Sequence, residues 1–135
     1  MRKNTPQPPR KNNQKLRSDQ GIDDDYRCPV AVTLEVIGGK WKAVIIWHLT
    51  FKTLRFSQLQ RRLPKITQKM LTQQLRELER DGMVHRQVFP EVPPRVEYSL
   101  TEAGRSLKPL VTQMCQWGRD QLERKDGSAP SSCAE

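Results

Sequence analysis

The sequence predicts a mainly α-helical domain that carries a single β-hairpin. Three observations support this fold class. Apolar residues recur every three or four positions along most of residues 29–125, which is the helical period. Two short stretches, 84–89 and 96–100, instead have the composition of strands and are joined by a proline-rich turn. Ahead of these strands, Leu63-Pro64 separates two short helical stretches, because proline lacks an N–H and restrains the residue before it.

One folded domain is expected at residues 27–125, with polar tails on both sides. A chain of 135 residues is long enough for one such core. Residues 1–26 are rich in basic, Asn, Gln and Pro residues and contain few apolar ones. Such a segment cannot bury enough surface to offset the entropy of ordering, so we predict that it is disordered. We predict the same for residues 126–135.

Two helices are expected ahead of the central pair. Cys28-Pro29 opens the first, since proline is tolerated at the first helical position, and Gly38-Gly39 ends it. The second occupies residues 41–50, where the apolar residues share one face. A short extended piece at 53–56 then leads into the central pair.

The central pair is a helix–turn–helix at residues 57–82. Ser57 is placed to cap the first helix, with Gln60 completing a capping box. Thr67 is placed to cap the second helix, which runs to residue 81. Gly82 then supplies the left-handed position that commonly ends a helix.

The second helix of this pair has two different faces. At about 100° per residue, Leu71, Leu75 and Leu78 fall within roughly 60° of one another and must face a core. The opposite side carries only basic and uncharged polar residues: Lys69, Thr72, Gln73, Arg76 and Arg80. These side-chain types bind phosphates and read base edges. Taken alone, the pattern equally fits an ordinary solvated helix face.

The segment after the central pair favours nucleic-acid binding. The strands at 84–89 and 96–100 form a hairpin directly after the helix–turn–helix, which is the position of a wing. Arg86 and Arg95 are placed there to meet phosphates beside the groove. The predicted fold class is therefore a winged helix-turn-helix.

The C-terminal helix is expected to begin at Thr101 as its cap and to carry a continuous apolar stripe. The members of the stripe are Leu107, Leu110, Val111, Met114 and Trp117. The domain has a core without this stripe, so a second copy of the chain is the expected cover. Val30 of the first helix is assigned to the same interface.

Net charge also favours an anionic partner. The formal charge is +9, and residues 55–95 hold nine Lys and Arg against four Asp and Glu. This distribution suits DNA better than a membrane. No apolar run approaches the roughly 18 residues that span a bilayer, and no signal-peptide core follows the N-terminus, so we expect a cytoplasmic protein.

The sequence offers no sign of catalysis or of a metal site. Three cysteines (Cys28, Cys115 and Cys133) and two isolated histidines lack metal-ligand spacing. Motifs of nucleophile elbows, phosphate loops and dinucleotide sites are missing from the sequence. We therefore expect neither an enzyme nor a cofactor.

Several motifs, in order, resemble the HxlR-type family of bacterial winged-helix transcription regulators over roughly residues 27–118. They are CPV at the first helix, GGKW before the second, RFSQLQRRLPKIT, MLTQQLRELERDG, and the pattern P-x-V-E-Y-x-L-T-x-x-G at residues 94–104. The resemblance implies a DNA-binding homodimer that is assembled through the first and last helices. It also implies that the second helix of the central pair enters the major groove.

Together these inferences predict a site that reads double-stranded DNA, with a roughly palindromic operator for a homodimer. The expected base-reading residues lie on the second helix or at its start: Thr67, Gln68, Lys69, Thr72, Gln73 and Arg76. The expected phosphate contacts are Arg55, Lys65, Arg86 and Arg95.

The signal that controls binding has two alternative interpretations. Some members of the family sense oxidants or electrophiles through a cysteine just before the first helix, and Cys28 occupies that position. A helix N-terminus and the neighbouring Arg27 both favour the reactive thiolate, while three aspartates at 23–25 oppose it. In the alternative, Cys28 is structural and a small molecule binds at the dimer interface.

Overall fold

The computed structural model describes residues 27–127. The tail predicted at 1–26 and nearly all of the one predicted at 126–135 lie outside these residues. The chain divides into two compact units, residues 1–35 and 36–135, each of which is described by itself.

The described part of the first unit holds most of helix α1 (Pro29–Ile37), which begins with proline as the sequence predicts. The guanidinium of Arg27 lies 2.7 Å from the carboxylate of Glu35. Val30 and Leu34 are exposed, at 67% and 58% of their full surface.

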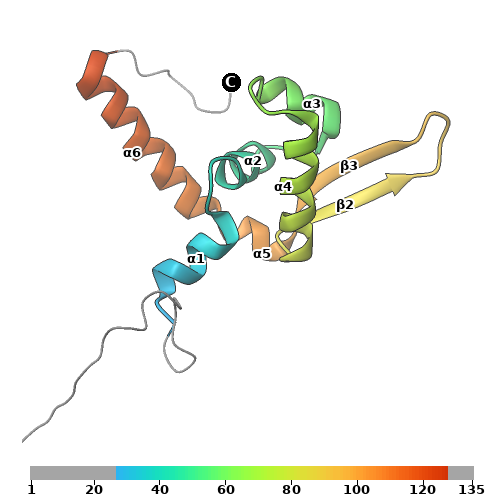
Figure 1. The fold of residues 1–135 in the computed structure, drawn as a ribbon, viewed down its shortest axis with the longest axis horizontal. Coiled ribbons are helices and arrows are strands. Elements are labelled where there is room, and N and C mark those ends of the chain that lie inside the picture. The colour runs from blue at the N-terminus through green and yellow to red at the C-terminus, as the bar shows by residue number, and fades with distance from the viewer. Residues whose placement is uncertain (1–26, 128–135) are drawn as a thin grey trace, which may run out of the picture. The chain divides into compact units, whose positions relative to one another are not determined.

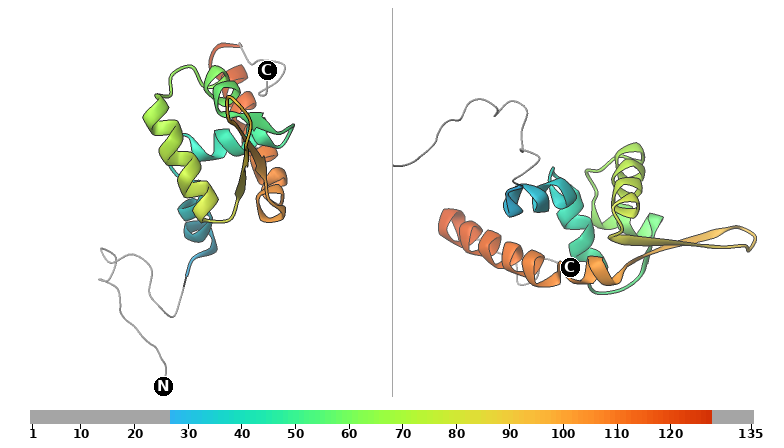
Figure 2. Two further views of the ribbon diagram at one scale, coloured as in Figure 1. Left: turned by 90° about the vertical axis from the view of Figure 1, so that its right-hand side faces the viewer. Right: turned by 90° about the horizontal axis from the view of Figure 1, so that it is seen from below.

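The second unit holds the remaining elements, which appear along the chain in an order that confirms the winged-helix prediction. They are α2 (Lys42–Leu49), β1 (Leu54–Arg55), α3 (Phe56–Arg62), α4 (Gln68–Arg80), β2 (Val84–Phe89), β3 (Arg95–Leu100), α5 (Glu102–Arg105) and α6 (Lys108–Asp126). In Figure 1 and in the right-hand view of Figure 2, the β2–β3 hairpin extends beyond α4 as a projecting arm.

The three strands form one antiparallel sheet in the order β1-β3-β2. Arg86 of β2 pairs with Tyr98 of β3, and Leu54 of β1 pairs with the same tyrosine from the other side. The sequence predicted the extended piece at β1 but not its pairing with β3. This pairing places the start of α3 against the base of the wing.

The core is built from the apolar faces of the helices and the base of the sheet. Leu71, Leu75 and Leu78 of α4 are at most 2% exposed, which confirms the predicted apolar face. They join buried residues of α2, α3 and the strands, among them Ile45, Leu59 and Val84. At about 25 cal/mol per Å² of apolar surface removed from water, this burial holds α4 against the domain.

Helix α3 begins one residue before its predicted cap. Its cap position is Arg55 rather than Ser57, and the side chain of Gln58 accepts a hydrogen bond from the Arg55 backbone N–H at 2.8 Å. Strand β1 ends at the same residue. The sheet pairing therefore sets the start of the helix, and the serine lies within its first turn.

Thr101 caps a helix as predicted, but that helix is short. Its hydroxyl accepts from the Gly104 N–H at 3.0 Å and caps α5, which ends at Arg105. A separate helix, α6, begins at Lys108 with proline in its first turn. The prediction of one continuous helix from Thr101 is wrong, because Pro109 has no N–H to bond back into a preceding turn.

Thr101 also joins the end of α4 to the start of α5. Its backbone N–H donates to the Met83 carbonyl at 3.0 Å, and its hydroxyl donates to the Gly82 carbonyl at 2.6 Å. Gly82 adopts a φ of 80°, the left-handed conformation predicted for the residue after α4. One threonine therefore ties together two connections that are about 20 residues apart in sequence.

Candidate nucleic-acid interface

The helix–turn–helix is organised by its turn. Leu63 and Ile66 are each 4% exposed, so the turn between α3 and α4 is anchored in the core. The Thr67 hydroxyl accepts from the Met70 backbone N–H at 3.0 Å, which confirms the predicted cap of α4. The first turn of α4 is left exposed, including Gln68 and Lys69.

The polar face of α4 lies opposite its buried leucines. Lys69, Gln73 and Arg76 are exposed, and Thr72 is half-buried. Arg80, on the same arc, is also exposed. Four of the six predicted base-reading residues, Lys69, Thr72, Gln73 and Arg76, thus share one face of a helix whose opposite face is buried in the core. Of the other two, Thr67 precedes α4 as its cap and Gln68 is its first residue.

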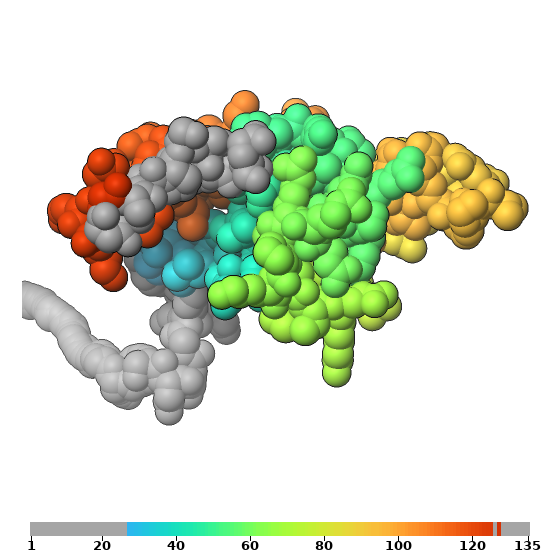
Figure 3. All heavy atoms as spheres, turned by 90° about the horizontal axis from the view of Figure 1, so that it is seen from above, coloured from blue at the N-terminus to red at the C-terminus, as the bar shows by residue number. Residues whose placement is uncertain are grey.

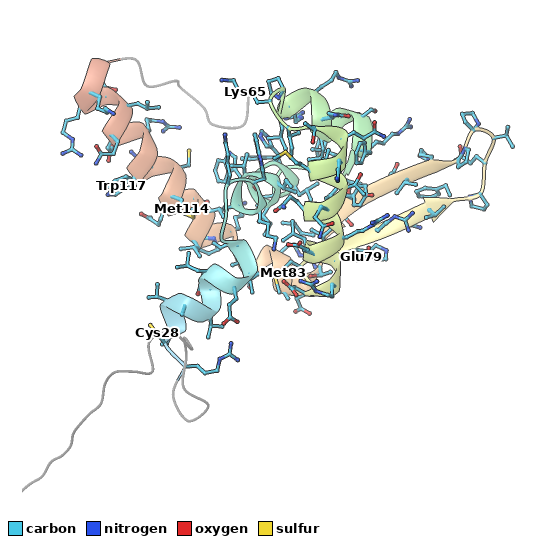
Figure 4. All side chains as sticks on the ribbon, viewed as in Figure 1. Cys28, Lys65, Glu79, Met83, Met114 and Trp117 are labelled. Carbon is cyan, nitrogen blue, oxygen red and sulfur yellow. The ribbon has the colours of Figure 1, made fainter. Side chains whose placement is uncertain are left out.

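A polar cleft of about 320 Å³ lies between α4 and the sheet. Its lining consists of Thr72, Leu75, Arg76, Glu79, Arg86 and Tyr98. Sequence reasoning placed Arg76 with the base readers and Arg86 with the wing; the structure brings both to the same cleft. The sequence did not predict Glu79 as part of this cleft. Glu79 shares a helix face with Thr72 and Arg76, at positions i, i+4 and i+7. Figure 4 shows Glu79 on the side of α4 nearest β2.

Two of the predicted phosphate contacts on the wing differ in their surroundings. Arg86 is exposed on β2. Arg95 instead contacts Glu91 at 2.8 Å and Glu97 at 3.0 Å, and its guanidinium lies 3.9 Å from the ring centre of Phe89. Because two carboxylates already compensate its charge, Arg95 is better suited to holding the two strands together than to binding phosphate. Figure 3 shows the hairpin, in yellow and orange, beside the green surface of α3 and α4.

Further basic residues lie on β1, on α3 and in the turn before α4. Arg55 and Lys65 are exposed, and Figure 4 shows Lys65 in the turn that precedes α4. A second polar depression, of about 650 Å³, is lined by Lys52, Gln58, Arg61, Arg62 and Pro64. Arg61 and Arg62 were not among the residues predicted for the site. Two adjacent arginines in α3 are the sequence feature that could have indicated this depression.

A partly buried ion pair lies beside the polar face of α4. Lys42 of α2 is 8% exposed, and its Nζ lies 2.6 Å from Oε1 of Glu77. The other carboxylate oxygen of Glu77 accepts from Nε2 of Gln73 at 2.7 Å. Hydrogen bonds from Gln73 and then from Lys42 lower the pKa of Glu77 below its usual value.

The apolar stripe predicted along the last helix is divided between the core and the surface. Val111 is only 3% exposed and belongs to this chain's own core, with Leu107 packed against it. The expectation that the whole stripe is left for a partner is therefore wrong for Val111. Leu110, Met114 and Trp117 remain exposed at 39%, 46% and 67%. Figure 4 labels the last two on α6.

The described residues contain two cysteines in different chemical states. Cys28 is a half-buried thiol one position before α1. Arg27, which was expected to favour its thiolate, is instead 2.7 Å from Glu35, so part of its charge is compensated. Cys115 on α6 is disulfide-bonded.

Within residues 27–127, no group of three or more His, Cys, Asp and Glu residues could hold a metal ion. No described helix is long and apolar enough to cross a membrane.

A core-anchored helix–turn–helix with a basic polar face, followed by a hairpin beside that face, defines the winged helix-turn-helix class of DNA-binding proteins. The family model described as HxlR-like helix-turn-helix matches residues 36–126. The chain therefore belongs to the HxlR-like helix-turn-helix family, as the motifs of its sequence predict.

Two similar proteins are described as HTH-type transcriptional regulators. The HTH-type transcriptional regulator YdeP of Bacillus subtilis (strain 168) is 53% identical over 114 residues, which cover 84% of this chain and 89% of YdeP. YybR of the same organism is 59% identical over 99 residues, covering 71% of this chain and 79% of YybR.

Solved structures agree with the fold. The oxidised form of the redox regulator HypR is 58% identical, with a TM-score of 0.67, and the match covers 69% of this chain and 96% of that one. The reduced form of the transcriptional regulator YodB from B. subtilis is 36% identical, with a TM-score of 0.63, and the match covers 75% of this chain and 100% of YodB.

Proposed function

We propose that this protein is a transcriptional regulator that binds a specific DNA duplex through α4. The observation that carries the proposal is the exposed face of α4, where Lys69, Gln73 and Arg76 project from a helix whose opposite side is at most 2% exposed. A rigid helix with these side chains suits the major groove, where Arg reads guanine and Gln reads adenine. Arg86, which lines the same cleft as Arg76, contacts the phosphates that flank the groove in this proposal.

The protein acts on DNA as a homodimer in this proposal. Leu110, Met114 and Trp117 form an exposed apolar surface on α6, and Val30 adds an exposed apolar residue on α1. Removing such a surface from water favours association of two copies. A two-fold dimer places its recognition helices about 34–36 Å apart, so the operator is roughly palindromic.

Two substitutions separate base reading from charge attraction. Arg76→Ala should weaken binding to the specific site by about 1–3 kcal/mol and relax the preference for one base. Lys65→Ala, the matched control in the exposed turn, should weaken binding to all sequences alike and lower the salt slope by about one. Both are measured by fluorescence anisotropy on the operator and on a scrambled duplex over a range of salt concentrations. Equal operator binding by wild type and Arg76→Ala would remove Arg76 from the reading face.

Oxidation is the proposed signal, and Cys28 the proposed sensor. Support comes from the position of its half-buried thiol at the start of a helix, where the partial positive charge of the helix favours the thiolate. It also comes from two similar solved structures, the oxidised redox regulator HypR and diamide-treated YodB. In this proposal α1 belongs to the contact between the two copies, and a bulky adduct or a disulfide at Cys28 changes that contact and with it the spacing of the two recognition helices.

A gel shift with and without diamide tests this signal. Wild-type protein should change its operator affinity on treatment, and Cys28→Ser should not. Mass spectrometry of the treated wild type identifies the product. If diamide changes both proteins equally, or neither, Cys28 is structural.

A small molecule is the alternative signal. It is supported by an apolar cavity of about 500 Å³ between α2 and α6, whose lining includes Val44, Trp47, Met114 and Leu122. Insensitivity of DNA binding to diamide would favour this alternative.

A further inference from the structure

Lys42 is a buried cation on a helix that does not belong to the reading face. It is the first residue of α2 and is 8% exposed. A buried ammonium group is costly unless it is paired. Glu77 of α4 provides the pairing carboxylate at 2.6 Å, although the two residues are 35 positions apart in sequence.

The pairing with Lys42 leaves the second oxygen of Glu77 for one residue of the reading face. That oxygen lies 2.7 Å from Nε2 of Gln73, one helical turn earlier on α4. The hydrogen bonds to Gln73 and Lys42 lower the pKa of Glu77, so the group is ionised near neutral pH. An ionised carboxylate only accepts hydrogen bonds. Gln73 must therefore turn its NH₂ group toward Glu77, and its carbonyl oxygen stays available.

We propose that Lys42 and Glu77 are positioning residues that hold the amide of Gln73 in one orientation, so that Gln73 selects adenine in the major groove. In this orientation the Gln73 oxygen accepts from adenine N6, and its second N–H donates to adenine N7. The inference rests on the proposed function, in which α4 enters the groove. It goes further by giving one side chain a defined base and by making part of the specificity depend on a residue of α2.

The exchange Glu77→Gln tests this orientation because it keeps the shape of the side chain. Its carbonyl oxygen can still accept from Lys42, but its NH₂ group then faces Gln73. The amide of Gln73 must rotate so that its oxygen accepts this bond, which leaves its N–H groups for the base. We expect the preference for adenine at one position of each half-site to fall by roughly tenfold or more, in favour of guanine or thymine, which present acceptors there.

The measurement is enrichment of bound duplexes from a randomised pool with the full-length protein. Gln73→Ala, enriched in parallel, identifies which position Gln73 reads. Adding Glu77→Gln to Gln73→Ala should change no base preference beyond that of Gln73→Ala alone. Removing the negative charge of Glu77 raises affinity for all duplexes alike, so only the ratio between bases at one position is informative.

Thermal unfolding of each variant shows whether a change in base preference results from loss of folding instead of from a changed contact with the base. If Glu77→Gln unfolds because Lys42 is left without an ionised partner, the double variant Lys42→Met with Glu77→Gln removes both charges. Neither amide is then held in one orientation, so the preference for adenine should fall without a shift toward guanine or thymine. An unchanged adenine preference in the folded variant would overturn the proposal, as would a Gln73→Ala protein with wild-type preferences at every position. A wild-type protein that enriches no sequence would instead overturn the proposed function itself.

Discussion

Replacing Met114 with glutamate should convert the proposed dimer to a monomer. Met114 lies between Leu110 and Trp117 on the exposed face of α6, and all three keep at least 39% of their surface. A carboxylate at this position would be buried without a partner when two copies associate, which opposes association. A monomer contacts one half-site only, so operator affinity should fall by about a hundredfold or more.

Sedimentation velocity measures the assembly state, and anisotropy measures the affinity. Thr112→Glu is the matched control, because it introduces the same charge at an exposed position on roughly the opposite side of α6. It should remain a dimer. The α6 face is not the interface if Met114→Glu sediments as wild type does, and a wild-type monomer would remove the dimer from the proposed function.

Gly104→Ala should destabilise the domain by about 3 kcal/mol. A Cβ at this position would lie 2.1 Å from the backbone carbonyl oxygen of Met83 and 3.2 Å from the Leu100 side chain. The nearest obstacle is backbone, so a change of rotamer cannot relieve the overlap. The capped turn of α5 must move away from the end of α4, which weakens the hydrogen bonds that Thr101 makes to it.

Urea unfolding followed by circular dichroism measures this effect. Gly118→Ala is the control, because nothing lies within 4 Å of a Cβ added there. That substitution should leave stability unchanged or raise it by up to about 1 kcal/mol, since alanine favours helix more than glycine does. Equal midpoints for the two variants would mean that α5 and Met83 separate at little cost.

The parts of the fold that depend on local signals could be predicted from the sequence. The cap at Thr67, the glycine at residue 82 and the leucine period between them define α4 within one residue at each end. The two strands of the wing follow from composition and a proline-rich turn in the same way. These signals act between residues a few positions apart, so a sequence pattern contains them.

The features that the sequence did not predict depend on contacts between distant segments. Pairing of β1 with β3 moved the start of α3 ahead of Ser57. Val111 had the same period as its exposed neighbours, yet it is buried in the core cluster. Periodicity shows which residues share a face; it does not show what covers that face.

The candidate site divides in the same way. The polar face of α4 was predicted, because it is the complement of the leucine face. The ion pairs of Arg95 and the contact between Lys42 and Glu77 were not predicted, because the sequence does not show which oppositely charged residues the fold brings together. The cleft that joins Arg76 to Arg86 depends on how α4 lies against the wing.

The hydrogen bonds of Thr101 have a mechanical consequence. Through Gly82 and Met83 they attach the last turn of α4 to the segment that leads into α5 and α6. A torque applied along α6 has two routes to α4: the core side chains around Val111, and this short joint of backbone and hydroxyl hydrogen bonds. Rotation of α5 therefore either carries the end of α4 with it or breaks two hydrogen bonds. The joint therefore links α6, the proposed dimer helix, to α4, the proposed reading helix.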